Sequence, residues 1–386
     1  MNLRIRSLRS WIAATLALAA LVAAVSVTFA AAPAPAAQPS AARLDQLLRQ
    51  FSRAHPSFPG VALAVTTPTL NWAGAAGVAD RATGKPLNAR AGFRIASVTK
   101  TFTAAAVLRL VEDGKLSLDD PIAQHLSPST VALLRRGHYD VGAIHVRHLL
   151  QHTSGLYDYA EDPAYQTSVV GHGRHRWTRA EQVRFATTHG KPLFRAGTNF
   201  RYSDTAYILL GEILERQTGH SLAAAYRALL GFDKLGLRHT YLETLERTPA
   251  QAAPRAHQYL GTLDTTGFDP SFDLYGGGGL VSTVDDLARF YRALLGGQVF
   301  NRAATLATML GKQHPSRPAD LGMGIFAESI GQESCWHHDG FWGSAVMHCP
   351  RTGVTIAVTV NQATGFDAAV RQLAAAVLRL VGPHGK

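Results

Sequence analysis

The sequence predicts an α/β protein of the α+β kind, in which an antiparallel sheet is flanked by helices and an all-helical lobe is inserted into the chain. Strand-like runs occur early, at 61–66 and 70–78, and return only at 344–348 and 354–361. The long stretch between them, to about residue 310, has mostly helical patterns and long loops. Strands at both ends with helices between them indicate one sheet built from both termini.

Helical spacing marks the segments that would cover this sheet. In 41–51, Leu44, Leu47, Leu48 and Phe51 fall on one face of a helix. A second helix is predicted for 97–113, where Gly114 supplies the stop. Further helices are expected to begin at 116–121, to span 146–152, and to close the chain at 368–381. The predicted elements form one two-lobed domain over 41–386.

Composition and charge narrow the class of protein. The chain has 386 residues, of which 46% are hydrophobic and 17% charged, an ordinary balance for a globular protein with a large core. The net charge is +11, which raises the possibility of a nucleic-acid partner. However, the basic residues are scattered and form no run of five or more. We therefore expect no nucleic-acid partner.

The N-terminus has the pattern of an export signal. Arg4, Arg6 and Arg9 precede an apolar stretch at 11–30, and small residues suited to cleavage surround Ala30. We assign 1–30 to a signal peptide and 31–40 to an Ala/Pro-rich spacer. An uncleaved membrane anchor is the alternative, because the apolar run is long. Either reading predicts a periplasmic or secreted protein.

The two cysteines, Cys335 and Cys349, fit an exported protein. If they face each other across an antiparallel hairpin, the midpoint falls at residue 342, inside a Gly-Phe-Trp-Gly turn. An oxidising compartment would then permit a cross-strand disulfide. Two unpaired buried thiols are the alternative.

Ser97 and Lys100 form the first chemical motif. They lie three residues apart at the start of a predicted helix, so their side chains share one face. A serine hydroxyl needs a neighbouring base to become a nucleophile. A lysine can be that base if burial and nearby positive charge lower its pKa. By itself the pattern also fits an N-capping serine followed by a surface lysine.

Two further segments favour the catalytic interpretation of the Ser97–Lys100 motif. They are 200–211 (FRYSDTAYILLG) and 336–343 (WHHDGFWG). In this order, the three motifs resemble the serine hydrolase family that contains class C β-lactamases, D-alanyl-D-alanine carboxypeptidases and related esterases, which carries S-x-x-K, Y-x-N and then K-T-G or H-x-G. Supporting blocks occur at 77–81, 114–121, 149–156 and 278–283. The resemblance runs from about residue 59 to at least residue 361 and implies a β-lactamase/penicillin-binding-protein-like fold.

The resemblance implies a role for each matching residue. Ser97 would be the nucleophile, Lys100 its partner in proton transfer, and Tyr202 a general base that later protonates the leaving group. The backbone N–H groups of Ser97 and Phe341 would form the oxyanion hole.

His338 and Gly340 would lie on the strand beside the cleft. We expect Gly340 to let the substrate backbone approach that strand.

Two departures from the family pattern bear on the substrate. Asp204 stands where the family most often has Asn, and it can hold Lys100 charged but lacks the amide donor. His338 replaces the lysine of K-T-G and attracts a substrate carboxylate less strongly. Both changes favour a peptidase or esterase over an efficient β-lactamase.

The sequence therefore predicts a serine hydrolase acting on amide or ester bonds through an acyl-enzyme, with D-alanyl peptides or small acyl esters as substrates. The alternatives are a β-lactamase and a penicillin-recognising sensor that does not turn over. A monomer that needs no cofactor is expected. His148 and His152 have the spacing of metal ligands, but their sequence block indicates that His152 is a structural residue beside the cleft, and we expect no metal.

Overall fold

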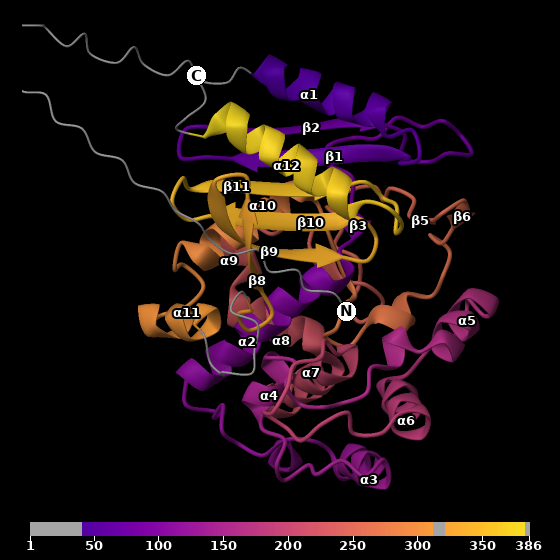
Figure 1. Ribbon diagram of the computed structural model, residues 1–386, viewed down its shortest axis with the longest axis vertical. Coiled ribbons are helices and arrows are strands. Elements are labelled where there is room, and N and C mark those ends of the chain that lie inside the picture. The colour runs from indigo at the N-terminus through magenta and orange to yellow at the C-terminus, as the bar shows by residue number, and fades with distance from the viewer. Residues whose placement is uncertain (1–40, 312–320, 383–386) are drawn as a thin grey trace, which may run out of the picture. The chain divides into compact units, whose positions relative to one another are not determined.

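A six-stranded antiparallel sheet joins the two ends of the chain. The computed structural model describes residues 41–311 and 321–382, so the predicted signal peptide and spacer lie outside the described residues. The strand order is β2-β1-β11-β10-β9-β8 (Figure 1). The strands are β1 (Gly60–Thr66), β2 (Asn71–Gly77), β8 (Phe326–Ile330), β9 (Glu333–Gly340), β10 (Ser344–Cys349) and β11 (Val354–Thr359). Because β1 pairs with β11, the prediction of one sheet from both termini is confirmed.

Helices cover both faces of this sheet. On one face, apolar side chains of α1 (Ala41–Ala54) and α12 (Asp367–Val381) pack with the sheet in one buried cluster (Figure 1). On the other face, α10 (Val284–Leu295) contacts β1, β10 and β11. Every residue of β1, β10 and β11 is buried as a result. The middle of the chain thus supplies one layer of the sandwich as well as the helical lobe.

The rest of the middle segment forms the lobe that carries the active-site helix. Its central element is α2 (Thr99–Glu112), which packs against α7 (Asp204–Thr218) and α8 (Leu222–Leu230). The remaining α-helices are α3 (Pro128–Arg136), α4 (Val146–Leu150), α5 (Pro163–Gly171), α6 (Arg179–His189), α9 (Phe232–Leu235) and α11 (Ala303–Leu310). Single 3₁₀ turns are η1 (Ala96–Val98), η2 (Ile122–Gln124), η3 (Tyr159–Glu161) and η4 (Pro270–Asp273). The helix expected to begin within 116–121 is therefore reduced to the turn η2.

Two small sheets in the middle segment were not predicted. One has the order β3-β7-β4 and the other pairs β5 with β6. Their strands are β3 (Phe93–Arg94), β4 (Tyr241–Leu242), β5 (Tyr259–Leu260), β6 (Leu263–Asp264) and β7 (Leu280–Ser282). Runs of two or three residues are too short to give a periodic pattern. Within the described residues, no helix is both long enough and apolar enough to cross a membrane.

Cys335 and Cys349 form a disulfide across the β9–β10 hairpin. The register pairs Gly340 with Ser344 and Trp336 with His348, so the hairpin is centred on residue 342, as the sequence predicted. Both cysteines are fully buried in the cluster beneath α12. The alternative of two unpaired thiols is wrong.

We predict that the double substitution Cys335→Ala with Cys349→Ala lowers the free energy of unfolding by about 3 kcal/mol, because the cross-link closes a short loop in the unfolded chain. Urea denaturation of the oxidised protein and of the variant measures the difference. Dithiothreitol should destabilise the wild type and leave the variant unchanged. Equal stability of the two oxidised proteins would contradict the prediction.

Candidate active site

Ser97 is held at the junction between a strand and a helix. The strand β3 pairs with β7, and the backbone N–H of Ile95 donates a hydrogen bond of 3.0 Å to Leu280 O. The chain then turns sharply, because Ala96 has a φ of 42°, a left-handed conformation that is costly for a residue with a Cβ. Ser97 follows, half-buried, in the turn η1 that leads into α2. A strained turn of this kind fixes the direction of the serine hydroxyl.

Lys100 is fully buried and its ammonium group has three oxygen partners. Nζ donates hydrogen bonds to Ser97 Oγ at 2.9 Å and to Gly277 O at 2.7 Å, and it forms an ion pair with the Asp204 carboxylate. A Cβ on Gly277 would lie 2.9 Å from Asp204 Oδ1, so only glycine fits there without displacing the carboxylate. The alternative of a capping serine with a surface lysine is therefore wrong.

The electrostatics of Lys100 favour the charged form. Burial lowers the pKa of Lys100, but Asp204, together with Tyr202 and Asp273, raises it to a net value above that of a free lysine. In the resting site Lys100 is an ammonium ion that donates to Ser97, so a second group must take the serine proton.

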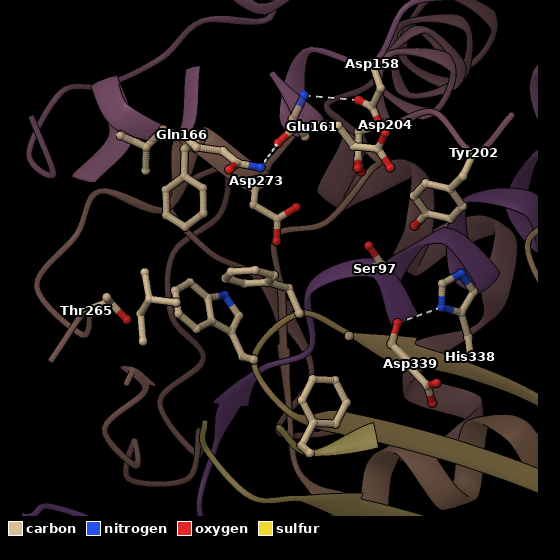
Figure 2. Close-up of a pocket in the computed structure, with 18 of the residues that line it drawn as sticks. Ser97, Asp158, Glu161, Gln166, Tyr202, Asp204, Thr265, Asp273, His338 and Asp339 are labelled. Atoms are coloured by element: carbon tan, nitrogen blue, oxygen red, sulfur yellow. Dashed lines mark hydrogen bonds between the residues drawn. The ribbon is translucent and has the colours of Figure 1, made fainter. Parts of the chain in front are cut away.

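Tyr202 is the neighbouring group that can do so. Its hydroxyl faces Ser97 in Figure 2. Burial raises the pKa of Tyr202 above that of a free phenol, whereas the charge of Lys100 and hydrogen bonding to Lys100 and Ser97 oppose this rise. A neutral phenol cannot accept the serine proton, so Tyr202 can act as a base only as its phenolate. That phenolate would lie beside the ammonium group of Lys100, whose Nζ is 5.0 Å from the centre of the Tyr202 ring.

His152 fixes the segment that carries Tyr202. Its ring stacks on Tyr202 with 4.4 Å between ring centres, and its Nδ1 accepts a hydrogen bond of 3.1 Å from the backbone N–H of Ser203. Its carbonyl accepts another, of 2.9 Å, from the backbone N–H of Arg201. The prediction of a structural residue beside the cleft is confirmed. The Nδ1 of His148 is also in use, because it accepts from the backbone N–H of His145.

His338 lies on β9, on the same side of Ser97 as Tyr202 in Figure 2, and is uncharged at neutral pH. Its Nδ1 is 2.8 Å from Asp339 O, and since a carbonyl only accepts, Nδ1 carries the proton. Burial, followed by the charge of Lys100, lowers the pKa of His338 to about 3. Within the described part of the chain, Nε2 has no hydrogen-bond partner. His338 therefore presents a lone pair rather than a positive charge.

Gly340 is the last residue of the same strand, and Phe341 follows it in the turn to β10. A Cβ on Gly340 would lie 2.2 Å from Ile95 O and 2.3 Å from Ser344 Oγ, so the glycine lets β9 approach the turn that precedes Ser97. The backbone that approaches Gly340 is therefore the protein's own, at Ile95, and not the substrate backbone that the sequence analysis expected. The Phe341 side chain is 52% exposed and lines the cleft. The predicted oxyanion hole of the Ser97 and Phe341 N–H groups stays a prediction.

Two carboxylates near Lys100 were missed from the sequence. Asp158 caps η3 and Asp273 ends η4, and both line the cleft with Asp204 (Figure 2). Burial and the charge of Asp204 raise the pKa of Asp158 to about 8 and that of Asp273 to about 7. Neither residue is part of a sequence motif with a characteristic spacing. Each lies at one end of a short turn, and only the tertiary fold brings that turn to the cleft.

These residues lie in one open cleft of about 1460 Å³. Ser97 and Tyr202 are on its wall with the acidic residues, and much of the remaining surface is apolar (Figure 2). The largest apolar side chains are those of Tyr165, Phe268, Phe272, Phe326, Phe341, Trp342 and Phe366. Among the described residues, no group of three or more His, Cys, Asp or Glu is arranged to hold a metal.

Comparisons with known proteins agree with this geometry. The family model described as Beta-lactamase matches residues 44–379. Esterase EstB of Burkholderia gladioli is 37% identical over 202 residues, covering 51% of this chain and 50% of the esterase. The chain spans about half the length of the curated relatives it matches.

Solved structures match over nearly the whole fold. A D-stereospecific amidohydrolase from Streptomyces sp. aligns with a TM-score of 0.73 and 28% identity over 90% of this chain and 100% of its own. A D-amino acid amidase from Ochrobactrum anthropi SV3 aligns with a TM-score of 0.75 and 25% identity over 89% of this chain and 99% of its own. The predicted fold class is confirmed.

We predict that Asp273→Asn stabilises the protein at pH 8 and leaves its stability at pH 4 nearly unchanged. The folded pKa of about 7 lies above the ordinary value of 3.8, so ionisation of Asp273 destabilises the fold progressively as pH rises between these values. The expected gain at pH 8 is on the order of 2 kcal/mol. Urea denaturation at both pH values measures it, with the exposed Asp119→Asn as control. A variant less stable than the wild type at pH 8 would contradict the prediction.

Proposed function

This chain belongs to the Beta-lactamase family of serine hydrolases, and from that premise we propose that it hydrolyses amide or ester bonds through an acyl-enzyme on Ser97. The observation that carries the proposal is the contact between Lys100 Nζ and Ser97 Oγ, with Tyr202 beside both. The esterase and amidohydrolase names of its relatives support the same class of reaction.

In the proposed acylation, Tyr202 first loses its proton to solvent, and Ser97 Oγ then attacks the substrate carbonyl carbon while its own proton passes to the Tyr202 phenolate oxygen. The ammonium group of Lys100 stabilises the Tyr202 phenolate before the attack and the charge that develops on the serine oxygen during it. The N–H groups of Ser97 and Phe341 would bind the carbonyl oxygen. When the tetrahedral intermediate collapses, the bond to the leaving group breaks and Tyr202 returns the proton to it.

Deacylation would reverse these roles. A water molecule gives its proton to Tyr202 and attacks the acyl carbon, and Ser97 Oγ leaves with a proton from Tyr202. Lys100 keeps its proton in both halves of the cycle, because its carboxylate partner Asp204 does not change.

The cleft favours substrates without a free carboxylate. His338 is neutral where the family can have a lysine, and Asp158, Asp204 and Asp273 surround the other side of Ser97. Asp204 is neutralised by Lys100, but the ionised form of Asp273 would repel a carboxylate, and a carboxylate would find no cation at His338. We therefore propose an esterase or amidase activity ahead of D-alanyl carboxypeptidase or β-lactamase activity.

The alternative from another functional class is a sensor protein that is acylated on Ser97 but does not release the acyl group. Such a protein needs the nucleophile but not a base for deacylation. Here the base candidate Tyr202 is fixed by His152 and in contact with the ammonium of Lys100. This arrangement favours turnover.

We also propose that the protein acts in the periplasm or outside the cell as a monomer. The predicted signal peptide at 1–30 would direct export, and the Cys335–Cys349 disulfide suits an oxidising compartment. Cleavage of the signal, or its retention as a membrane anchor, would be read from the N-terminal sequence of the mature protein.

We predict that Ser97→Ala abolishes enzymatic hydrolysis of a short-chain 4-nitrophenyl ester and that Tyr202→Phe lowers kcat by more than tenfold. Loss of a general base typically costs about 10²–10⁴ in rate. Tyr157→Phe is the matched control, because its hydroxyl bonds Asp162 away from Ser97 and should leave the rate unchanged.

Equal rates of ester hydrolysis for the wild type and Ser97→Ala would show that Ser97 is not the nucleophile. A near-normal rate for Tyr202→Phe would show that another group takes the proton. A fluorescent penicillin, followed on a gel, separates the two classes, since a sensor stays labelled whereas an enzyme loses or never keeps the label.

A further inference from the structure

One part of the active-site cleft is lined by apolar side chains. Figure 2 shows Gln166 and Thr265 on the side of Ser97 opposite Tyr202, so the cleft continues past the nucleophile in that direction. Helix α5 and residues 260–272 form this part of the cleft, which we call the α5 arm. Its apolar lining consists of Val169, Val170, Leu260, Phe268 and Phe272.

The α5 arm leaves apolar surface open to solvent. Val170 is 48% exposed, and in the described part of the chain only three other large hydrophobic side chains are exposed, those of Leu193, Leu263 and Phe341. Val170 and Phe341 both line the cleft. Exposed apolar surface that gathers in one place marks a binding site. Because this surface is continuous with Ser97, we expect its occupant to be a part of the substrate.

The polar side chains of the α5 arm already donate hydrogen bonds to the protein itself. They are Tyr165, Gln166, Thr167 and Thr265, and their acceptors are the backbone carbonyls of Phe272, Ala160, Pro163 and Gln258, respectively. A peptide in this part of the cleft would need partners for its own backbone N–H and C=O groups. A hydrocarbon chain needs none, so the lining favours a hydrocarbon chain.

The charges of the cleft favour an uncharged substrate. Among the described residues that line the cleft, Arg371 is the only lysine or arginine, and it already pairs with Glu328 and Asp339. Figure 2 places the Asp273 carboxylate between Gln166 and Ser97, at the entrance to the α5 arm. An anionic group on the substrate would therefore meet a carboxylate there and no free cation.

We propose that the α5 arm binds an unbranched hydrocarbon chain, so that the substrates are uncharged esters or amides with a medium-length or long apolar chain. This assignment rests on the proposed function of Ser97. The chain can belong to the acyl group or to the alcohol or amine, since both present the same hydrocarbon surface to the arm. Each methylene group that leaves water for this surface stabilises the bound substrate.

The test is a set of esters that differ only in chain length. We measure kcat/KM below the solubility limit for 4-nitrophenyl butanoate, hexanoate and octanoate, and for butyl, hexyl and octyl acetate. We expect kcat/KM to rise about threefold for each added methylene in at least one series, from the transfer free energy of a CH₂ group. The series that rises shows which side of the ester enters the arm. A flat or falling kcat/KM in both series would overturn the proposal.

Two variants test whether the α5 arm causes this selectivity. Leu260 and Leu263 are cross-strand partners in the β5–β6 hairpin, but of the two only Leu260 lines the described cleft. We expect Leu260→Asn to lower the ratio of octyl-chain to butyl-chain kcat/KM about fivefold or more, because a polar amide replaces apolar contact area. Leu263→Asn is the matched control and should keep the wild-type ratio.

Val170→Asn should lower the same ratio in the same direction. Val170 is exposed, so this variant tests the α5 arm even if Leu260→Asn does not fold. A wild-type ratio in the folded Val170→Asn and Leu260→Asn proteins would overturn the proposal. An equal fall in Leu263→Asn would overturn it as well, since that side chain does not line the arm.

Failure of this proposal can be told apart from failure of the proposed function. Calorimetry on Ser97→Ala protein compares octanamide with butanamide, and N-octylacetamide with N-butylacetamide, and needs no turnover. Ser97-dependent hydrolysis with the same kcat/KM for all chain lengths would count against the α5 arm alone. Tighter binding of an octyl-chain amide, without Ser97-dependent hydrolysis of any ester, would count against the proposed function alone.

Discussion

The ammonium group of Lys100 is the point at which three separate parts of the chain meet. It is fully buried and bonds the hydroxyl of Ser97, the carboxylate of Asp204 and the carbonyl of Gly277. A buried charge is tolerated only when such partners surround it. The strained turn at Ala96 and the close approach at Gly277 both follow from this requirement, because each brings a partner within reach of Nζ.

The same charge organises the chemistry of the cleft. Lys100 lowers the pKa of His338 and opposes the effect of burial on the pKa of Tyr202. Asp204 holds Lys100 protonated, so the lysine acts as a fixed positive charge, and Tyr202 is left to move the proton. Asp158, Asp204 and Asp273 line the cleft near Ser97 in a protein that is basic overall.

The sequence predicted what depends on local pattern. The terminal strands, the sheet they share, the Cys335–Cys349 hairpin and the grouping of Ser97, Lys100 and Tyr202 all follow from periodicity or ordered motifs. Asp158 and Asp273 did not, because they stand at loop ends whose meeting depends on the whole fold. Strand β9 was placed through its motif rather than its pattern, since its His and Asp residues hide the usual alternation.

The central claim is that Ser97 reacts because a charged Lys100 lies beside it. The most direct measurement is the labelling rate of Ser97 by a fluorophosphonate, followed by intact mass, in the wild type, in Asp204→Asn and in the double variant Lys100→Met with Asp204→Asn. The double variant removes both charges together and leaves no unpaired buried carboxylate at that position. The account predicts a fall of about 100-fold or more in the double variant. Labelling of the folded double variant at a rate within threefold of the wild type would contradict it.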